Sequence, residues 1–282
     1  MKKLLAILVT AILAVTACLG LTACGNPIKY TKSTDQLGAL TEVKAGTSDI
    51  AVIDSVMANY YVNKDNFNDL TILTGEDFIF DNEYYAIGFR KNGNTKDYIN
   101  YALYTIQENG TLATIAAKYG LTDSLTPFTA AVNPGEPKAG SDFAYIKSQG
   151  KLKLGYTIFE PIAYKDADSK LIGFDIEVAE AVCGVLEITL ENVKINWDTK
   201  DDELTNKNID CIWNGFTYTE ERAKNVDFSA MYMVNRQAIV IRKTDAEKYN
   251  SYAAMKEAKF TAESESAGEE TILDIISKKI FG

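Results

Sequence analysis

The chain has 282 residues, of which 46% are hydrophobic and 24% charged, a composition that suits one two-lobed globular domain or two small ones. Its formal net charge of −10 argues against a nucleic-acid partner, because binding a phosphate backbone requires clustered lysines and arginines. The absence of histidine removes the most common general base and the most common zinc ligand. We therefore expect neither a metal site nor a cofactor.

The first 24 residues, "MKKLLAILVTAILAVTACLGLTAC", place two lysines before a long apolar run that ends in small residues and a cysteine. This order is typical of an export signal. The run is also long enough to span a bilayer as a retained anchor. The motif "LTAC" resembles a bacterial lipoprotein box, which implies cleavage of residues 1–24 and lipidation of Cys24; "VTAC" at Cys18 fits more loosely. We expect an extracytoplasmic protein anchored to the cell membrane by lipid.

Strand and helix patterns alternate between Leu37 and Leu121. Residues 47–55 ("TSDIAVIDS") and 83–91 ("EYYAIGFRK") are short β-rich runs. Residues 100–121 predict two amphipathic helices separated at Asn109-Gly110. Residues 126–142 then hold three of the five prolines, which predicts a linker over residues 129–140.

After the linker, strand patterns cover residues 150–157, 190–198, 208–215 and 231–243, and a helix pattern covers 173–188. A final helix follows a turn of small residues and reaches Ile280. Alternating strands and helices predict a mostly parallel sheet with helices on both faces. Cys183 and Cys211 both lie in apolar runs, where buried free thiols are common, but their pairing in a disulfide stays open.

The segments "GKLKLGYTIFEPIAYKDADSKLIGFDIEVAEAV" and "IDCIWNGFTYTEERAKNVDFSAMYMVNRQAIVIRK" resemble the first lobe of family 3 extracellular solute-binding proteins. These are the polar amino-acid receptors of ABC importers. "FTAESESAGEETI" is similar to the opening of the second lobe in that family. The continuation of that lobe resembles residues 30–62, near the other end of the chain, and residues 83–91 and 100–121 resemble the return to lobe one.

The resemblance implies an α/β, two-lobed periplasmic-binding-protein-like (type II) fold in circularly permuted order. Residues 26–128 would form the remainder of lobe 2 and the closing part of lobe 1. Residues 141–282 would form the first part of lobe 1 and the start of lobe 2. Permutation is physically reasonable because domain termini usually lie at the surface and often close together. A piece cut from a tandem of two receptors is the alternative.

A receptor for a free amino acid must hold a carboxylate and an ammonium group. Arginine pairs with a carboxylate through a planar fork of donors that lysine lacks. The resemblance assigns the ligand carboxylate to Arg222. It adds backbone and hydroxyl contacts from the first lobe and N–H groups at a helix N-terminus of the second lobe, where the helix dipole favours an anion. These further residues are Gly215, Thr217, Ser266, Ala267 and Gly268.

The resemblance assigns the ligand ammonium to Asp54, which follows a strand pattern. It makes Phe159 and Trp197 the two apolar walls around the ligand side chain. Tyr156 falls where several relatives carry a polar specificity residue, and Asn214 faces the same pocket. Aromatic walls with few charges favour a neutral polar or apolar amino acid.

The function implied is capture of a free amino acid by hinge closure and its delivery to the permease of an ABC importer, with no bond made or broken. An enzyme on the same fold, a dehydratase or a peptidoglycan-cleaving lyase, is the main alternative. It requires an acid or base in the cleft, for which Glu160, beside Pro161, is the candidate. A sensor or an inactive remnant of a tandem receptor is the third possibility.

Overall fold

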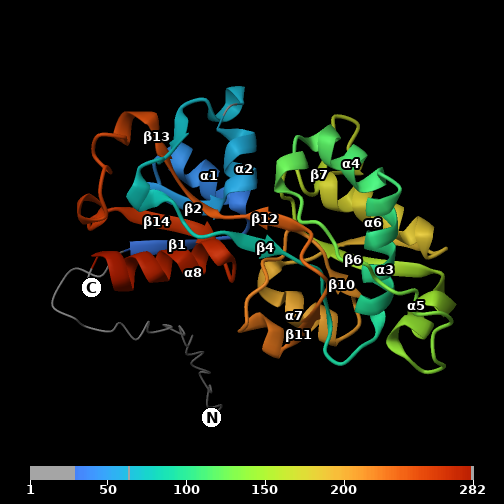
Figure 1. The fold of residues 1–282 in the computed structure, drawn as a ribbon. Coiled ribbons are helices and arrows are strands. Elements are labelled where there is room, and N and C mark those ends of the chain that lie inside the picture. Colours follow the sequence, from blue (N-terminus) through green and yellow to red (C-terminus); the bar gives the residue numbers. More distant parts are fainter. Residues whose placement is uncertain (1–28, 63, 281–282) are drawn as a thin grey trace, which may run out of the picture.

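The structure is a computed structural model, and it describes residues 29–62 and 64–280. The predicted signal peptide and Cys24 lie outside the described residues. Within these residues no helix is both long and apolar enough to cross a membrane. The described residues form two lobes, each built on a five-stranded sheet, as Figure 1 shows.

Lobe 2 contains the sheet with strand order β1-β14-β2-β13-β3. Its first three strands are parallel, and β13 and β3 each pair antiparallel with their neighbours. The strands are β1 (Lys29–Ser33), β14 (Lys259–Glu263), β2 (Ile50–Asp54), β13 (Gln237–Arg242) and β3 (Leu70–Ile72). Helices α1 (Gln36–Ala45) and α2 (Ser55–Tyr61) cover one face, and α8 (Ala267–Asp274) with the π-helix η8 (Ile275–Ile280) covers the other (Figure 1).

Lobe 1 contains the sheet with strand order β11-β5-β10-β6-β9. Strand β6 is parallel to both β9 and β10, and β5 is antiparallel to β10 and β11. The strands are β11 (Val226–Phe228), β5 (Gly88–Arg90), β10 (Cys211–Ile212), β6 (Lys151–Tyr156) and β9 (Thr189–Lys194). The helices are α3 (Thr95–Glu108), α4 (Thr111–Tyr119), α5 (Asp142–Gln149), α6 (Phe174–Val185) and α7 (Lys200–Thr205). The predicted two-lobed α/β fold is thereby confirmed.

Shorter elements complete the two lobes. Strands β7 (Tyr164–Lys165) and β8 (Leu171–Ile172) form a small hairpin, and β4 (Glu83–Tyr85) pairs with β12 (Met233–Asn235). The 3-10 helices are η1 (Asp65–Phe67), η2 (Glu76–Phe78), η3 (Thr122–Ser124), η4 (Trp197–Thr199), η5 (Arg222–Lys224), η6 (Lys243–Asp245) and η7 (Ala253–Met255).

Side-chain alternation along the strands explains how each sheet is covered on both faces. In β2, Ala51 and Ile53 pack with α1 and α2, whereas Ile50 and Val52 pack with α8. All five residues of β2 are buried, as expected of a central strand between two helical layers.

The start of helix α1 is set by its own sequence. The Asp35 side chain caps the helix by accepting a hydrogen bond from the Gly38 N–H at 2.7 Å.

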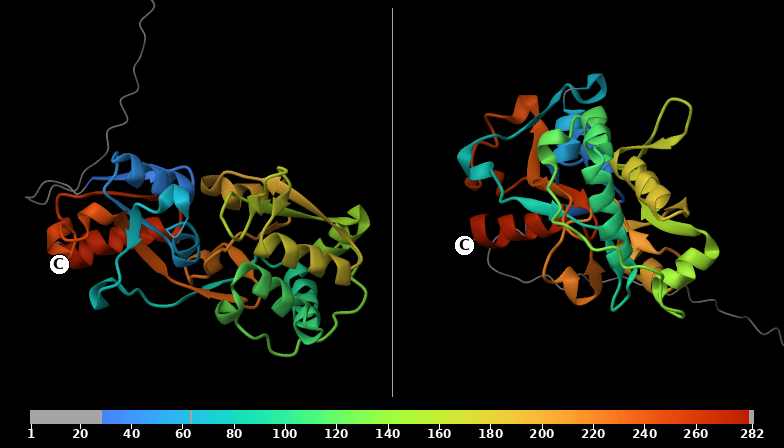
Figure 2. Two further views of the ribbon diagram at one scale, coloured as in Figure 1. Left: turned by 90° about the horizontal axis from the view of Figure 1, so that it is seen from above. Right: turned by 45° about the vertical axis from the view of Figure 1, so that its right-hand side comes forward.

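Each lobe combines residues from both parts of the chain (Figures 1 and 2). In lobe 2, β1 and β14 pair over five residues although more than 200 positions separate them in the sequence. Lys32 on β1 forms an ion pair with Glu269 of α8 at 2.8 Å, and the Tyr30 hydroxyl donates to the same carboxylate at 3.1 Å. The first described strand, β1, therefore lies beside β14 and α8 from the other end of the chain, all in one lobe.

Two predicted strands are each divided in the structure, at the places where the chain crosses between the lobes. The run 83–91 forms β4 and β5, and the run 231–243 forms β12 and β13, which Arg236 separates. Strands β4 and β12 pair with each other between the lobes, whereas β5 and β13 belong to the two large sheets. One continuous strand could not serve both sheets, so the prediction of single strands was wrong here.

Other local predictions hold. Helices α3 and α4 separate at Asn109-Gly110, where Gly110 adopts φ +79°. Residues 126–140 form neither helix nor strand. Cys183 and Cys211 are both buried free thiols, so the structure contains no disulfide between them.

Candidate binding site between the lobes

A small cavity lies where the carboxyl ends of the lobe 2 strands face lobe 1. Ligands of open α/β sheets commonly bind outside the carboxyl ends of the strands. Strand β2 ends at Asp54 and the adjacent parallel strand β14 ends at Glu263. Its volume is about 10 Å³, roughly the room of one water molecule, so the lobes are closed against each other here and must part to admit a ligand. The lining residues are Gln36, Asp54, Phe159, Trp197, Asn214, Gly215, Thr217, Arg222, Glu263, Ser266 and Ala267.

This set brings together nine of the eleven residues that the resemblance assigned to the ligand. They come from distant parts of the chain and from both lobes. Tyr156 and Gly268 are not among the lining residues, whereas Gln36 and Glu263 are lining residues that sequence reasoning missed.

Arg222 projects from η5 of lobe 1 toward lobe 2. Its Nη1 donates to the Thr217 carbonyl at 2.9 Å, and its Nη2 lies 2.9 Å from Oε1 of Glu270 on α8. The guanidinium carbon stands 5.2 Å from the centre of the Phe216 ring, a cation–π contact. Only 12% of the Arg222 side chain is exposed, against 57% for Glu270. An anion that entered the cavity could thus replace an exposed partner of a fixed guanidinium.

Gly215 lies in a tight turn that only glycine fits. Its φ is +61°, and a Cβ would come within 2.6 Å of the Phe159 ring. Its N–H donates at 2.8 Å to Oδ2 of the fully buried Asp175, which also accepts the Tyr232 hydroxyl at 2.8 Å. The Gly215 N–H therefore points to Asp175 and not into the cavity, and Asp175 holds the turn in place.

Asp54 is buried and surrounded by side-chain amides. It accepts from Gln36, Asn235 and Gln237, and its own N–H donates to Gln36 Oε1 at 3.0 Å. Burial raises the pKa of Asp54 above its usual value, although these amide hydrogen bonds act in the opposite direction. No ion pair joins Asp54 to a cation among the described residues. A ligand cation beside this buried carboxylate would stabilise its ionised form.

The turn before α8 provides the lobe 2 edge of the cavity. Ser266 caps the helix: its Oγ accepts from the Glu269 N–H at 3.3 Å and donates to the Glu263 carbonyl at 2.7 Å. Gly268 lies behind this edge, because a Cβ there would meet the Val52 carbonyl oxygen at 2.4 Å. Gly268 thus lets α8 approach β2 closely.

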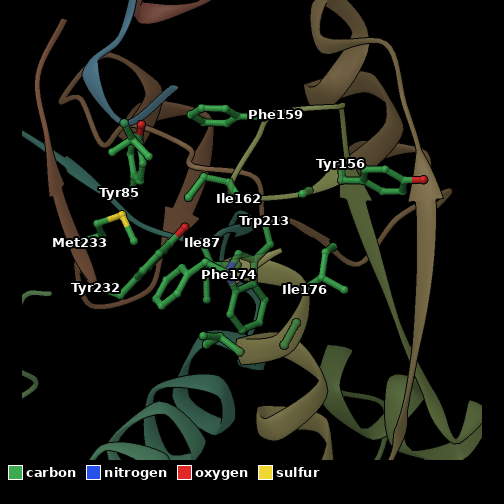
Figure 3. Packing of buried hydrophobic residues seen from close by; sticks show 14 of the residues in the cluster. Tyr85, Ile87, Tyr156, Phe159, Ile162, Phe174, Ile176, Trp213, Tyr232 and Met233 are labelled. Atoms are coloured by element: carbon green, nitrogen blue, oxygen red, sulfur yellow. The ribbon is translucent and has the colours of Figure 1, made fainter. Parts of the chain in front are cut away.

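Phe159 and Trp197 stand in lobe 1 as aromatic walls of the cavity. Phe159 packs edge-on against Tyr85, with ring centroids 6.4 Å apart (Figure 3). Trp197 packs edge-on against Phe216 at 5.6 Å, and its buried Nε1 has no hydrogen-bond partner among the described residues. Both walls are more than nine-tenths buried.

Tyr156 takes a different position from the one expected of a specificity residue. It is the last residue of β6, only 7% exposed, and its side chain points away from Phe159 and Tyr85 (Figure 3). It shares a strand face with Leu152 and Leu154 of the core, so alternation directs it toward the helical layer. Asn214 does line the cavity, with its amide 2.9 Å from the Thr157 hydroxyl.

The cleft carries more carboxyl groups than its sequence suggested. Asp54 and Glu263 line the cavity, and Glu83 of β4 lies just outside the lining, where it accepts from Gln237 Nε2 at 2.9 Å and from the Thr217 hydroxyl at 3.4 Å. The expectation of few charges was therefore wrong, because burial brings together acids that are far apart in the sequence. One of these acids could have been found in the sequence, because Glu263 ends a strand directly before the turn "SESAG".

Burial raises the pKa of Glu83 to about 7, and the nearby Asp54 adds to the effect. The usual pKa of 4.5 applies when the chain is unfolded, so the folded state binds this proton more tightly. We therefore expect the free energy of unfolding of the ligand-free protein to fall as pH rises from about 4.5 through 7. In Glu83→Gln this fall should be smaller by on the order of 2 kcal/mol between pH 5 and 8. Melting curves of both proteins across this range check this, and identical pH profiles would contradict it.

Glu160, the candidate acid of the enzyme alternative, is not among the lining residues of this cavity. It follows Phe159 and lies beside Tyr60 and Tyr61 of α2, whose pKa values its carboxylate helps to raise. Among the described residues, no group of three or more acids or cysteines is placed to hold a metal ion.

Two α/β lobes joined by crossing strands, with a polar cavity between strand ends, define a two-lobed solute-binding fold. Residues 152–280 match the bacterial extracellular solute-binding proteins, family 3. A mutant of the arginine-bound form of domain 1 from TmArgBP is 34% identical, covering 37% of this chain and 87% of that one, with a TM-score of 0.32. The chain belongs to family 3 of the bacterial extracellular solute-binding proteins.

Two curated relatives illustrate the range of this likeness. The L-cystine-binding protein TcyA of Bacillus subtilis (strain 168) is 34% identical over 121 residues, 42% of this chain and 44% of its own length. The membrane-bound lytic murein transglycosylase F of Enterobacter sp. (strain 638) is 32% identical over 117 residues, 40% of this chain and 22% of its own. The match thus spans less than half the length of either relative.

Proposed function

We propose that this protein captures a free amino acid between its lobes and delivers it to the permease of an ABC importer. The observation that carries the proposal is the meeting of Arg222 from lobe 1 and Asp54 from lobe 2 at one cavity. The two side chains carry the opposite charges that an amino-acid zwitterion requires. TcyA, whose name describes binding of an amino acid, supports the same class of ligand.

The mechanism is hinge closure. The ligand carboxylate binds Arg222 in place of Glu270, and the ligand ammonium binds Asp54. Movement about β4 and β12 then brings the turn at Ser266 over the ligand and excludes water, which strengthens both ion pairs. Binding shifts the equilibrium between open and closed states, and a permease can distinguish the two.

The order of the lobes is part of the proposal. The pairing of β1 with β14 and the ion pair of Lys32 with Glu269 complete lobe 2 within one chain. These contacts support a circular permutant, with residues 26–128 and 141–282 as the exchanged parts and 129–140 as the linker. A piece of a tandem receptor would instead complete its lobes between molecules. The mass of the protein in solution separates these outcomes.

The same proposal places the protein outside the cytoplasm, held at the membrane by a lipid on Cys24. The sequence of residues 1–24 supports this location, and so does the family, whose description is extracellular. Mass spectrometry of the protein extracted from membranes tests it: a lipid adduct at Cys24 is expected, and a free thiol there would contradict the anchor.

A panel of amino acids in a thermal-shift assay tests the proposed binding. We expect one cooperative transition, raised by at least one amino acid by roughly 5–10 °C at a concentration about 100 times its Kd. A non-binding sugar of similar size is the control for osmolyte effects. A folded monomer that no amino acid stabilises would overturn the proposal.

An enzyme on this fold remains the second candidate, because one observation favours it. Burial raises the pKa of Glu263 well above its usual range and that of Glu83 to about 7, which suits general acids of a cleft. The likeness to transglycosylase F is compatible with this class. Turnover of prephenate or arogenate, or cleavage of peptidoglycan, by the purified protein would establish the enzyme instead.

A further inference from the structure

Glu263 is a buried acid that the proposed capture of a zwitterion leaves unused. It ends β14 and lines the cavity, and it is only 4% exposed. Its Oε1 is fully buried and has no hydrogen-bond partner among the described residues. A buried carboxyl oxygen without a hydrogen bond lowers the stability of the protein, and a hydrogen-bond donor on a ligand would remove that cost.

Glu263 has no ion-pair partner among the described cations, although the charge of Lys200 acts on it. Lys200 of α7 lowers the pKa of Glu263 through its charge, but its Nζ donates to the carbonyls of Trp197 at 3.3 Å and Glu265 at 3.4 Å. No ion pair within 4 Å links Lys200 to Glu263 in the described part of the chain. Asp54 and Asp35 lie close enough to repel Glu263, so its surroundings are acidic on balance.

The charges of the cavity can be assigned one by one. The ligand carboxylate takes Arg222 and the ligand ammonium takes Asp54, which leaves the Glu263 carboxyl to face the ligand side chain in the space that opens when the lobes part. The walls around that space are Phe159 and Trp197, which suit the methylene groups of a side chain. A side chain with an apolar stem and a cationic end would therefore match both the walls and the acid.

We propose that Glu263 pairs with a positively charged ligand side chain, so that the site selects basic amino acids over neutral ones. This inference rests on the proposed amino-acid capture and names the class of ligand within it. It replaces the preference for a neutral ligand that the sequence suggested. Burial also raises the pKa of Glu263, and a cation in the cavity would restore the ionised form.

Isothermal titration with matched ligands tests the inference. Lysine and norleucine share a straight side chain and differ in the terminal ammonium, and ornithine, arginine and glutamine complete the panel. We expect the wild-type protein to bind lysine, ornithine or arginine at least roughly 30-fold more tightly than norleucine or glutamine. Glu263→Gln should remove most of this difference while its affinity for norleucine stays within a few-fold.

Glu265→Gln is the matched control, because it makes the same charge change two residues away on the same turn. The Glu265 side chain is 59% exposed and pairs with Lys32 at 3.4 Å, outside the cavity lining. This variant should keep the preference for a basic ligand. If Glu263→Gln does not fold, the comparison of lysine with norleucine in the wild-type protein still decides the question.

The outcomes separate the two levels of the proposal. Wild-type protein that binds norleucine or glutamine as tightly as the basic amino acids would overturn the inference and leave amino-acid capture standing. A preference for basic ligands that Glu263→Gln and Glu265→Gln reduce equally would also overturn it, because a general charge effect would then suffice. Folded protein that binds no member of a full amino-acid panel would remove the proposed function itself.

Discussion

Replacing Arg222 with alanine should abolish amino-acid binding and leave the fold intact. The variant loses the guanidinium that would hold the ligand carboxylate, and removal of one partner from a buried charged pair costs about 2–5 kcal/mol, or roughly 30-fold to several thousand-fold in Kd. The structural cost should be modest, because the ion-pair partner of Arg222 is the exposed Glu270. The variant otherwise loses one hydrogen bond to the Thr217 carbonyl and the contact with the Phe216 ring. Isothermal titration with the amino acid found in the thermal-shift panel measures the effect.

Two further variants give this test its controls. Arg222→Lys keeps the charge but loses the planar fork, so we expect intermediate affinity. Arg236→Ala removes an exposed arginine of the crossing segment, whose Nη2 donates to Asn82 at 3.0 Å, and should bind normally. Unchanged affinity in Arg222→Ala, with a normal melting curve, would refute the assignment of the carboxylate site.

Asp54→Asn should weaken binding by roughly 100-fold or more and make the stability of the ligand-free protein less sensitive to pH. This comes at the cost of hydrogen bonds that the carboxylate accepts from Gln36, Asn235 and Gln237. Asparagine has the same shape but cannot pair with the ligand ammonium. Burial raises the pKa of Asp54, so the folded state keeps its proton more tightly than the unfolded state does. The ionised acid consequently lowers stability as pH rises above about 4, and the neutral amide removes that loss. The Tm of the variant relative to the wild-type protein should therefore be higher at pH 8 than at pH 5.

Asp49→Asn is the matched control, because Asp49 lies just before the other end of β2. Its carboxylate lies 3.0 Å from Arg242 Nη2 and accepts the Lys259 N–H at 3.0 Å. The same substitution there should lower Tm and leave amino-acid affinity unchanged. If Asp54→Asn lowers Tm as Asp49→Asn does, and binds normally, then Asp54 is a structural acid and the ammonium site lies elsewhere.

The two variants at Arg222 and Asp54 also bear on hinge closure. Arg222 belongs to lobe 1 and Asp54 to lobe 2, so each variant removes the ligand's hold on one lobe only. Loss of binding in both would mean that the ligand must bridge the lobes before affinity develops. Loss in Arg222→Ala alone would place most of the binding energy in lobe 1.

The sequence by itself predicted the α/β class from its patterns, and the family resemblance supplied nine of the residues that line the cavity. Alternating patterns depend on local periodicity, so they predicted β2, β6, α6 and the break at Gly110 correctly. The roles of Arg222 and Asp54 came from the resemblance to the family, which rests on short continuous motifs. These features require no knowledge of which strands are neighbours.

Only the tertiary structure decided the electrostatics of the site. Glu263 and Glu83 are 180 residues apart, and both come close to Asp54 because β14 pairs with β2 and β4 pairs with β12. Whether an acid is desolvated, and whether its oxygens find donors, depends on such contacts between distant elements. The same holds for Tyr156, which strand alternation directs into the core, and for the strands that divide where the chain passes from one lobe to the other.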